Sequence, residues 1–361
     1  MVGNMAIQYN GRIEDLHILS YGDLITPYAL KAQFPLTTKA EETVGVARRG
    51  IRRILSGEDE RMLLILGPCS IHDAAAAKDY SERLKPLRER VKDKFEVVMR
   101  TYFEKPRTNS ADWRGLVYEP RLDGQERVNE GLTVARQFLL YNAEIGLPSG
   151  TEFVDTHIPQ HLSDTVSWVA IGARTVESPL HRQLASGLSP PVGFKNSTAG
   201  NVKVAVDAVS SARESLWFPG IDDYGRSKVF LTTGNPDTHI VLRGGDNGPN
   251  YDVGNVAKAQ EMLRKAGFGD RLMIDCSHGN SGKDYRQQPM IFEDVMKQRV
   301  EGNKGIVALM MESNIEEGNQ KVVAGRALKY GVSITDSCIG WGTTEEIILD
   351  AYRTLKGIAA H

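Results

Sequence analysis

Side chains that bind metal ions follow the apolar runs of this sequence. Cys69 follows one run in the segment GPCSIHD, His278 follows another in IDCSHGN, and Glu312 ends a third in MMESN. Asp336 comes later, in ITDSCIGW. Each residue alone is more typical of a buried thiol or a hydrogen-bonded turn, and no CxxC or HExxH motif is present. Together their sulfur, nitrogen and oxygen atoms form a ligand set for one divalent metal ion, Mn, Fe, Co or Zn.

Cationic side chains form a second set at or after the same kind of run: Arg100, Lys105, Arg107, Arg174, Lys195 and Arg243. An isolated exposed cation usually faces solvent, but a charge beside a buried strand is costly unless it is paired. Arg binds phosphate or carboxylate oxygens through two N–H groups, and Lys supplies a point charge or a proton. The set therefore predicts a polyanionic ligand.

A repeated strand–helix pattern is expected to position these residues. Eight short apolar runs are predicted strands: Leu63–Leu66, Val97–Arg100, Thr151–Val154, Trp168–Ile171, Val192–Lys195, His239–Arg243, Leu272–Asp275 and Ile306–Met310. Helices are predicted between them, at 74–91, through Val128–Leu139, and at 176–187, 200–213, 255–266, 286–300 and 343–356. Apolar strands separated by helices indicate parallel strands that are buried on both faces.

The pattern predicts a (β/α)₈ barrel, with an open doubly wound sheet as the alternative fold. Residues 61–361 are expected to form the barrel, which carries an inserted hairpin at 214–238 before the sixth strand. Residues 1–60, with a predicted helix at 39–56, are expected to form an extension. We expect both additions to serve oligomer or regulatory contacts; the alternative is a simple lid on the barrel bottom. Barrel active sites lie at the C-terminal ends of the strands, where both sets of residues stand.

The composition excludes several classes of protein. Hydrophobic residues are 41% and charged residues 25% of the chain, values typical of a globular protein. A formal charge of -2 gives no overall basic field for nucleic acid or an anionic membrane. No run of about 18 apolar residues and no signal-peptide layout occur, so we expect a cytoplasmic protein. Its 3 cysteines are too few for a disulfide framework.

The absence of GxGxxG, Walker and GxSxG patterns argues against dinucleotide binding, P-loop chemistry and serine hydrolysis. The residues thus predict a metal-dependent barrel enzyme that acts on small phosphorylated, carboxylated metabolites. A binding protein for such compounds is the alternative.

Long segments of the chain resemble the microbial type I 3-deoxy-D-arabino-heptulosonate 7-phosphate (DAHP) synthases of the feedback-regulated subgroup. They are GPCSIHD, MRTYFEKPRT, IGARTVES, PVGFKN, LRGG, MIDCSHGNS, MMESN and GVSITDSCIGW. The resemblance implies that phosphoenolpyruvate, erythrose 4-phosphate and water give DAHP and phosphate, the first step of the shikimate pathway to aromatic amino acids. The alternatives are a paralogue that uses another aldose phosphate, as in the related synthase of the eight-carbon sugar acid of lipopolysaccharide, and a non-catalytic metabolite-binding paralogue.

The resemblance also implies roles for individual residues. The implied metal ligands are Cys69, His278, Glu312 and Asp336. The implied phosphoenolpyruvate site consists of Arg100, Lys105, Arg174, Lys195 and Arg243, with Glu152 beside it. The segment Lys105, Pro106, Arg107 and Thr108 is expected to meet erythrose 4-phosphate. Lys105 is the candidate proton donor to the aldehyde oxygen, and His278 or Glu152 is expected to assist with water.

An effector site and an oligomer are implied in the same way. Asp155, Pro159, Gln160 and Ser189 match the effector site of the family. Gly220 stands where a serine tends to accompany phenylalanine control, so we expect tyrosine to be the preferred effector. The hairpin also departs from the family pattern at Asp222–Asp223, and the alternative is that it binds no effector. A homodimer or homotetramer is expected.

Overall fold

Parallel strands close into a barrel in the computed structural model, which describes residues 13–107, 109, 112–323 and 325–357. Hydrogen bonds join the strands in the closed order β1-β10-β9-β8-β5-β4-β3-β2. The eight are β1 (Met62–Gly67), β2 (Phe95–Arg100), β3 (Ser149–Glu152), β4 (Trp168–Ile171), β5 (Val192–Lys195), β8 (Thr238–Leu242), β9 (Leu272–Asp275) and β10 (Ile306–Glu312). The expected (β/α)₈ barrel is confirmed, and the open sheet is excluded.

The strands form where short aliphatic runs can be buried on both faces. Every residue of β1 and β10 is buried, as expected for strands with helices outside and packed side chains inside. The bounds of β3 differ from the expected Thr151–Val154. Ser149 and Gly150 pair with the end of β2, so the backbone pairing, which hydrophobicity does not reveal, sets where this strand begins.

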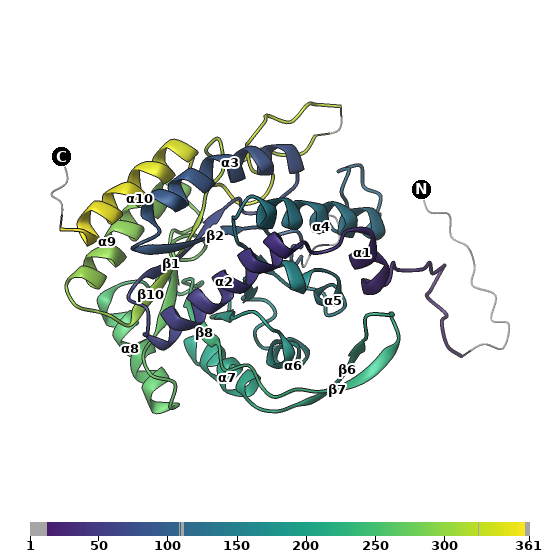
Figure 1. The fold of residues 1–361 in the computed structure, drawn as a ribbon, viewed down its shortest axis with the longest axis horizontal. Coiled ribbons are helices and arrows are strands. Elements are labelled where there is room, and N and C mark those ends of the chain that lie inside the picture. Colours follow the sequence, from purple (N-terminus) through teal and green to yellow (C-terminus); the bar gives the residue numbers. More distant parts are fainter. Residues whose placement is uncertain (1–12, 108, 110–111, 324, 358–361) are drawn as a thin grey trace.

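Seven helices of the repeat cover the outside of the barrel (Figure 1). They are α3 (Ala74–Val91), α4 (Val128–Glu144), α6 (Pro179–Gly187), α7 (Val202–Arg213), α8 (Val253–Lys265), α9 (Gln288–Val300) and α10 (Trp341–Leu355). Asp73 and Asp252 cap α3 and α8 by accepting backbone N–H groups of the first turn. Helix α6 begins later than the expected residue 176 because Pro179 occupies its first turn. No described helix is long and apolar enough to cross a membrane.

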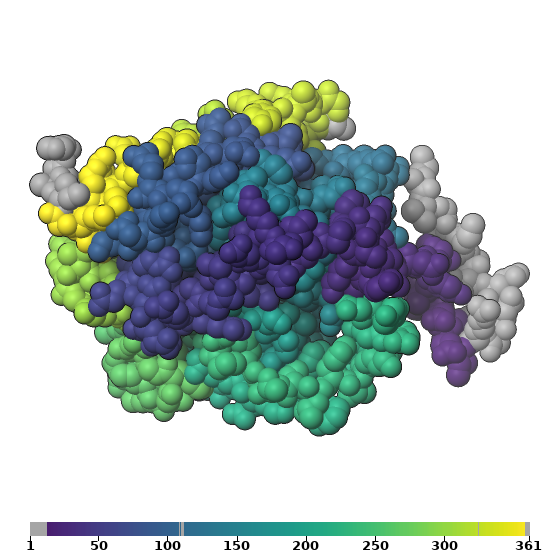
Figure 2. Space-filling model, viewed as in Figure 1, coloured from purple at the N-terminus to yellow at the C-terminus, as the bar shows by residue number. Residues whose placement is uncertain are grey.

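Helix α2 (Thr38–Ser56) closes the floor of the barrel, the end at which the strands begin. Its Ile51 and Ile54 are buried in the same cluster as the interior side chains Leu63 and Trp168. Figure 1 shows α2 crossing in front of the strands, and Figure 2 shows how much of that face it covers. A short helix, α1 (Pro27–Gln33), which the apolar pattern did not predict, precedes it.

The inserted hairpin consists of β6 (Trp217–Ile221) and β7 (Ser227–Leu231), which form an antiparallel pair outside the barrel. Its tip contacts the N-terminal segment. The backbone N–H of Tyr28 donates to the carbonyl oxygen of Asp223 at 2.7 Å, and the rings of Tyr28 and Tyr224 stack with centroids 5.1 Å apart. The opposite ends of the insertion lead into α7 and β8, so the hairpin extends from the wall of the barrel (Figure 1).

Candidate active site and metal centre

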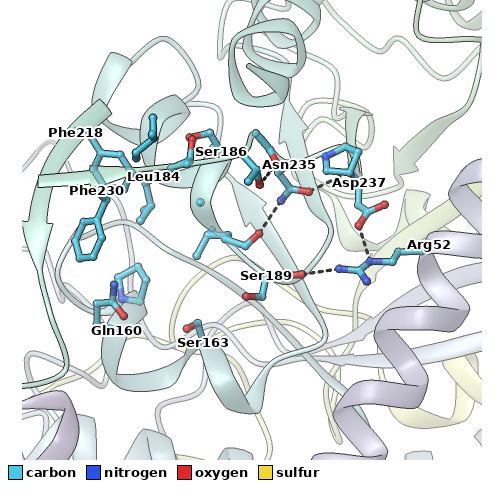
Figure 3. A pocket seen from close by; sticks show the side chains of 18 residues that line it. Arg52, Gln160, Ser163, Leu184, Ser186, Ser189, Phe218, Phe230, Asn235 and Asp237 are labelled. Carbon is cyan, nitrogen blue, oxygen red and sulfur yellow. Dashed lines mark hydrogen bonds and ion pairs between the residues drawn. The ribbon is translucent and has the colours of Figure 1, made fainter. Parts of the chain in front are cut away.

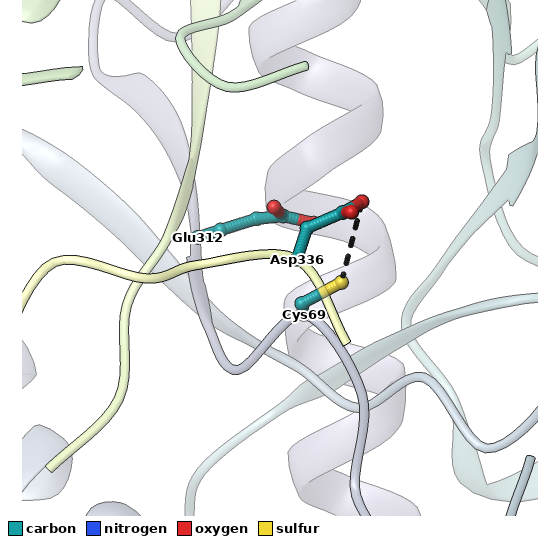
Figure 4. A group of neighbouring side chains, drawn as sticks. All are labelled: Cys69, Glu312 and Asp336. Carbon is teal, nitrogen blue, oxygen red and sulfur yellow. Dashed lines mark hydrogen bonds between the residues drawn. The ribbon is translucent and has the colours of Figure 1, made fainter. Parts of the chain in front are cut away.

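Three candidate metal ligands converge at the end of the barrel where the strands finish. Cys69 follows β1, Glu312 ends β10, and Asp336 lies in the loop before α10. One ligand atom from each lies within 4.8 Å of the other two (Figure 4). Cys69 and Glu312 are buried, whereas Asp336 is exposed. The convergence occurs because Gly67 of β1 pairs with Glu312 in the barrel, which places the two strand ends side by side.

His278 adjoins this cluster without belonging to that close group of three. Its Nε2 lies 3.5 Å from Oε1 of Glu312. Its Nδ1 faces Oδ2 of Asp275 at 2.9 Å and Oγ of Ser277 at 2.7 Å. The backbone of His278 is left-handed, with φ of 58°, an uncommon conformation for a residue with a side chain. Because Asp275 and Ser277 occupy Nδ1, Nε2 is the nitrogen directed toward the cluster.

The donor atoms of this cluster fit a divalent cation. Oε1 of Glu312 is buried and accepts no hydrogen bond from the described residues, although Nη2 of Arg100 lies 3.0 Å away. A buried carboxylate oxygen without a hydrogen bond is rare, and a coordinated ion would satisfy it. Thiolate, imidazole and carboxylate ligands are the mixed set that transition metals accept.

Two of the expected cations are held against the segment that carries Cys69. Nζ of Lys105 lies 2.7 Å from the carbonyl oxygen of Cys69 and 3.0 Å from its Sγ. Nη1 of Arg100 donates to the carbonyl oxygens of Pro68 and Cys69, each at 2.6 Å, and the guanidinium lies over the ring of Tyr102 at 3.6 Å. Burial raises the pKa of the Cys69 thiol, and the charges of Lys105 and Arg100 oppose that effect.

The remaining strand-end cations lie across the mouth of the barrel, the end where the strands finish. Nζ of Lys195 forms an ion pair with Oδ2 of Asp275 at 2.8 Å. Asp275 is fully buried, which opposes ionisation, yet His278 and Lys195 hold its pKa well below the usual range. Burial lowers the pKa of Arg243, and the nearby charge of Arg174 lowers it further.

Arg174 has no hydrogen bond or ion pair with the residues that the structure describes, and it is exposed. Arg243 makes a 3.3 Å contact with the carbonyl oxygen of Gly244 and has no carboxylate within ion-pair distance among those residues. Two guanidinium groups that repel each other and lack carboxylate partners form a site for an anion.

Glu152 and the segment after Lys105 complete the predicted site. The Glu152 carboxylate lies against Gly172, where a Cβ atom would be 2.0 Å from Oε1, so any larger residue there would displace the carboxylate. Pro106 is half-buried, and Arg107 is exposed with its Nε donating to the carbonyl oxygen of Trp113. Arg107 contributes to lowering the pKa of Asp336, which places its charge on the side of the metal cluster. Thr108 lies outside the described residues.

A separate cavity of about 770 Å³ contains three of the five expected effector residues, Pro159, Gln160 and Ser189 (Figure 3). Phe218 and Phe230 of the hairpin form its apolar side, and Arg52 and Asp237, which are paired at 2.5 Å, lie at the other end. Asp155 and Gly220 do not line the cavity. A Cβ atom at Gly220 would lie 2.9 Å from the ring of Phe230, so this position acts on the cavity through that ring.

Comparison with known proteins decides the family of the chain. The sequence profile described as the DAHP synthetase I family matches residues 33–349. The chain belongs to this family. It is 48% identical over 347 residues to the Phe-sensitive phospho-2-dehydro-3-deoxyheptonate aldolase of Escherichia coli K12, covering 96% of this chain and 99% of the relative. Membership confirms the resemblance that the sequence segments carried.

Two further proteins agree with this assignment to the DAHP synthetase I family. The Tyr-sensitive phospho-2-dehydro-3-deoxyheptonate aldolase of Escherichia coli K12 is 46% identical over 346 residues, covering 96% of this chain and 97% of the relative. A solved structure of phospho-2-dehydro-3-deoxyheptonate aldolase from Francisella tularensis SCHU S4 is 40% identical, with a TM-score of 0.92, and the match covers 95% of this chain and 100% of that chain.

Three residues of this member of the DAHP synthetase I family were not among the expected site residues. Asp275 joins Lys195 to His278, and its place at the last position of a predicted strand was the signal that could have found it. The guanidinium of Arg100 lies over the ring of Tyr102. Glu104 is buried, and burial raises the pKa of its carboxyl to about 8. The sequence around Glu104 contains no signal that its carboxyl group would be buried.

Proposed function

We propose that the chain condenses phosphoenolpyruvate with erythrose 4-phosphate and water to give DAHP and phosphate. Membership of the DAHP synthetase I family supports this activity. The observation that carries this proposal is that anion-binding guanidinium groups and a cluster of metal ligands lie together at the mouth of the barrel. Arg174 and Arg243 offer guanidinium groups without carboxylate partners, and the cluster of Cys69, Glu312 and Asp336 offers metal ligands beside Lys105.

Cys69, His278, Glu312 and Asp336 would hold one divalent ion, Mn, Fe, Co or Zn. Bound there, the ion would act as a Lewis acid on the aldehyde oxygen of erythrose 4-phosphate. The protein supplies the rest of the environment. Asp275 and Ser277 orient the His278 ring through Nδ1, so its Nε2 stays directed toward Glu312.

Binding of phosphoenolpyruvate is assigned to the cations that lie across the mouth. Arg174 and Arg243 would bind its phosphate oxygens, because an anion between them removes their mutual repulsion. Lys195 stays paired with Asp275, which fixes the position of its ammonium group at the mouth. Arg100 is assigned to the same site. Its Nη1 is held by the carbonyl oxygens of Pro68 and Cys69, which fixes the guanidinium, whereas its Nε has no hydrogen-bond partner among the described residues.

Proton transfer is assigned to Lys105. In the condensation, C3 of phosphoenolpyruvate forms a bond to the aldehyde carbon, and Lys105 Nζ donates a proton to the aldehyde oxygen. Water then adds at C2, assisted by Glu152 or His278, and the hemiketal phosphate loses inorganic phosphate by C–O cleavage. Fixing the two substrates face to face in a charged, largely buried mouth supplies much of the rate enhancement.

Feedback control by an aromatic amino acid is assigned to the 770 Å³ cavity of Figure 3. The aromatic rings of Phe218 and Phe230 suit an aromatic side chain, and the polar end near Ser189 and Arg52 suits an amino acid backbone. Tyrosine is the preferred effector in this proposal, because the absence of a side chain at Gly220 leaves the Phe230 ring free to move away from a phenolic hydroxyl.

A homodimer or homotetramer is supported by apolar side chains that have no cover in this chain. Trp217, Val229 and Leu231 on the hairpin are 64%, 66% and 57% exposed, and Leu19 and Tyr21 of the N-terminal segment are 95% and 96% exposed. Trp217 pairs with Leu231 across the hairpin, and an exposed apolar patch of this kind marks protein contacts. The phosphorylated substrates imply that the enzyme works in the cytoplasm.

Phosphate release from phosphoenolpyruvate tests the proposed function. The assay uses a panel of aldose phosphates, with and without a chelator. We expect release with erythrose 4-phosphate and its loss after chelation. Preference for another aldose phosphate would identify a specialised paralogue, and no release with any acceptor would identify a metabolite-binding protein.

A further inference from the structure

A second charged cavity lies at the floor of the barrel, the end opposite the mouth. It measures about 520 Å³ and is called the floor pocket below. Ile54, Met62, Val307 and Leu355 form its apolar part. Met62 begins β1, and Val307 lies near the beginning of β10, so the length of the strands separates the floor pocket from the metal cluster. Its cationic lining residues are Arg61, Lys94, Arg271, Arg299 and Lys304.

Most of the acidic groups of the floor pocket are already neutralised. Asp59 pairs with Arg61 at 2.9 Å, and Asp93 pairs with Lys356 at 2.9 Å. Glu60 is the remaining carboxylate of the lining, and it is exposed. No ion pair joins Lys94, Arg271 or Lys304 to any carboxylate of the described residues. The floor pocket therefore holds an excess of positive charge.

Arg271 is the most unusual of these cations. Its guanidinium lies on Gly57, where a Cβ atom would be 1.9 Å from Nη2, and Gly57 ends α2 with φ of 82°. It donates no hydrogen bond to the described part of the chain. Arg299 is fixed by the carbonyl oxygens of Lys304 and Glu60. Burial lowers the pKa of Arg299. The charge of Glu60 opposes this effect, and the charge of Arg271 adds to it, so the two guanidinium groups repel each other.

Stabilisation of α2 by a cation at its C-terminus is the simpler explanation for Arg271. This explanation does not account for the presence of Arg299, Lys94 and Lys304 in the same floor pocket. An anion held between Arg271 and Arg299 would remove their repulsion and fill the donors that Arg271 leaves unused.

We propose that the floor pocket binds a small dianion with a compact apolar body. Its charged group contacts Arg271 and Arg299, and its apolar body lies on Ile54 and Val307. A volume of 520 Å³ lies within the range of about 300–1,000 Å³ that is typical of small-molecule sites. Phosphate monoesters and dicarboxylates share this chemistry. The site is separate from the proposed catalytic mouth and does not depend on the proposed function.

Calorimetric titration of the full chain tests this proposal. The probes are phenyl phosphate and succinate as the two dianions, and benzoate as the monoanion. If the proposed function holds, phenyl phosphate should occupy two kinds of site in the wild type, the mouth and the floor pocket; if that function fails, the floor pocket should remain as a single site. Arg271→Gln should remove the floor-pocket site or weaken it about tenfold or more, and Arg174→Gln should weaken the other. Whether succinate shares the floor pocket decides between dicarboxylates and phosphate esters.

Two controls make the result decisive. Arg264→Gln alters an exposed arginine of α8 outside the floor pocket and should leave both sites unchanged. Lys94→Gln combined with Lys304→Gln changes side chains outside the core, and it should weaken the same site as Arg271→Gln. A lower unfolding temperature for Arg271→Gln with unchanged binding would show that Arg271 only supports α2, and the proposal would be wrong. Stronger binding of benzoate than of either dianion would also contradict it.

Discussion

The amine of Lys105 lies 3.0 Å from Sγ of Cys69 and 2.7 Å from the carbonyl oxygen of the same residue. The Lys105 side chain thus contacts the candidate thiolate ligand and lies at the mouth where the substrates are proposed to meet. In the proposed mechanism, metal binding and proton donation would therefore be coupled through a single amine. A change at either residue is expected to alter both.

Removing the Cys69 thiol should weaken metal binding and abolish most activity. Cys69→Ala leaves the harder ligands His278, Glu312 and Asp336, so we expect transition-metal affinity to fall about tenfold or more with the fold retained. Metal titration and circular dichroism measure the two effects. Cys276→Ala, at a buried thiol of the core, is the matched control and should bind metal normally. Full activity in metal-stripped wild type would refute the metal assignment.

Truncating Arg174 should mainly impair the use of phosphoenolpyruvate. Arg174→Ala removes a charged hydrogen-bond donor worth about 1.5–3 kcal/mol, so kcat/KM for phosphoenolpyruvate should fall about ten- to hundredfold. Steady-state kinetics with each substrate varied in turn measures the change. Arg90→Ala removes an exposed arginine of α3 that pairs with Glu345, and it should change neither constant. Unchanged kinetics in Arg174→Ala would show that this guanidinium only faces solvent.

A side chain at residue 220 should change effector choice but not uninhibited turnover. In Gly220→Ser the new Cβ would lie 2.9 Å from the Phe230 ring, which must move and so reshape the cavity. We expect tyrosine inhibition to weaken relative to phenylalanine inhibition, by the value of one hydroxyl hydrogen bond, about 0.5–1.5 kcal/mol. Ser227→Ala, at an exposed residue of the hairpin that does not line the cavity, should behave as wild type. Equal insensitivity of the wild type to tyrosine, phenylalanine and tryptophan would indicate an unregulated enzyme.

His239 should make the fold less stable in acid. Nε2 of His239 accepts a hydrogen bond from Nε1 of Trp168 at 3.0 Å inside the barrel, and burial lowers its pKa from 6.5 to about 4. Between these values the unfolded chain binds a proton that the folded chain does not. Unfolding free energy should therefore fall as the pH drops from 6.5 to about 4, by about 3 kcal/mol in all.

Denaturant unfolding at several pH values measures that loss. His239→Gln keeps a hydrogen-bond acceptor for Trp168 and does not titrate, so its stability should depend less on pH over the same window. Identical pH profiles for the two proteins would show that the pKa of His239 is the same in the folded and the unfolded chain.

The sequence predicted the barrel, because a strand end is visible as a polar or charged residue at or just after the end of an apolar run. Cys69, Glu312 and Lys195 were proposed as site residues on the same signal. The same signal could not distinguish Arg100, whose Nη1 is held by two backbone carbonyl oxygens, from Arg174, whose side chain has no hydrogen bond with the described residues. Both follow a strand, and only the folded backbone shows which carbonyl oxygens lie near.

Other features depend on segments that are distant in the chain. The floor pocket combines residues of the α2 end, the starts of β1 and β10, and the ends of α9 and α10, and no local pattern brings these together. The short helix α5 (Pro159–Leu162), which carries two of the expected effector residues, is too brief to show a helical period.

Helix α2 has a consequence for the order in which the chain can fold during synthesis. Ile51 and Ile54 emerge from the ribosome early, yet the cluster they join includes Met273 of β9 and Val307 of β10. Helix α2 therefore cannot bury its apolar face fully until β10, the last strand of the barrel, has been synthesised. Until then, the apolar face of α2 stays exposed on the nascent protein, and chaperones can bind such a surface.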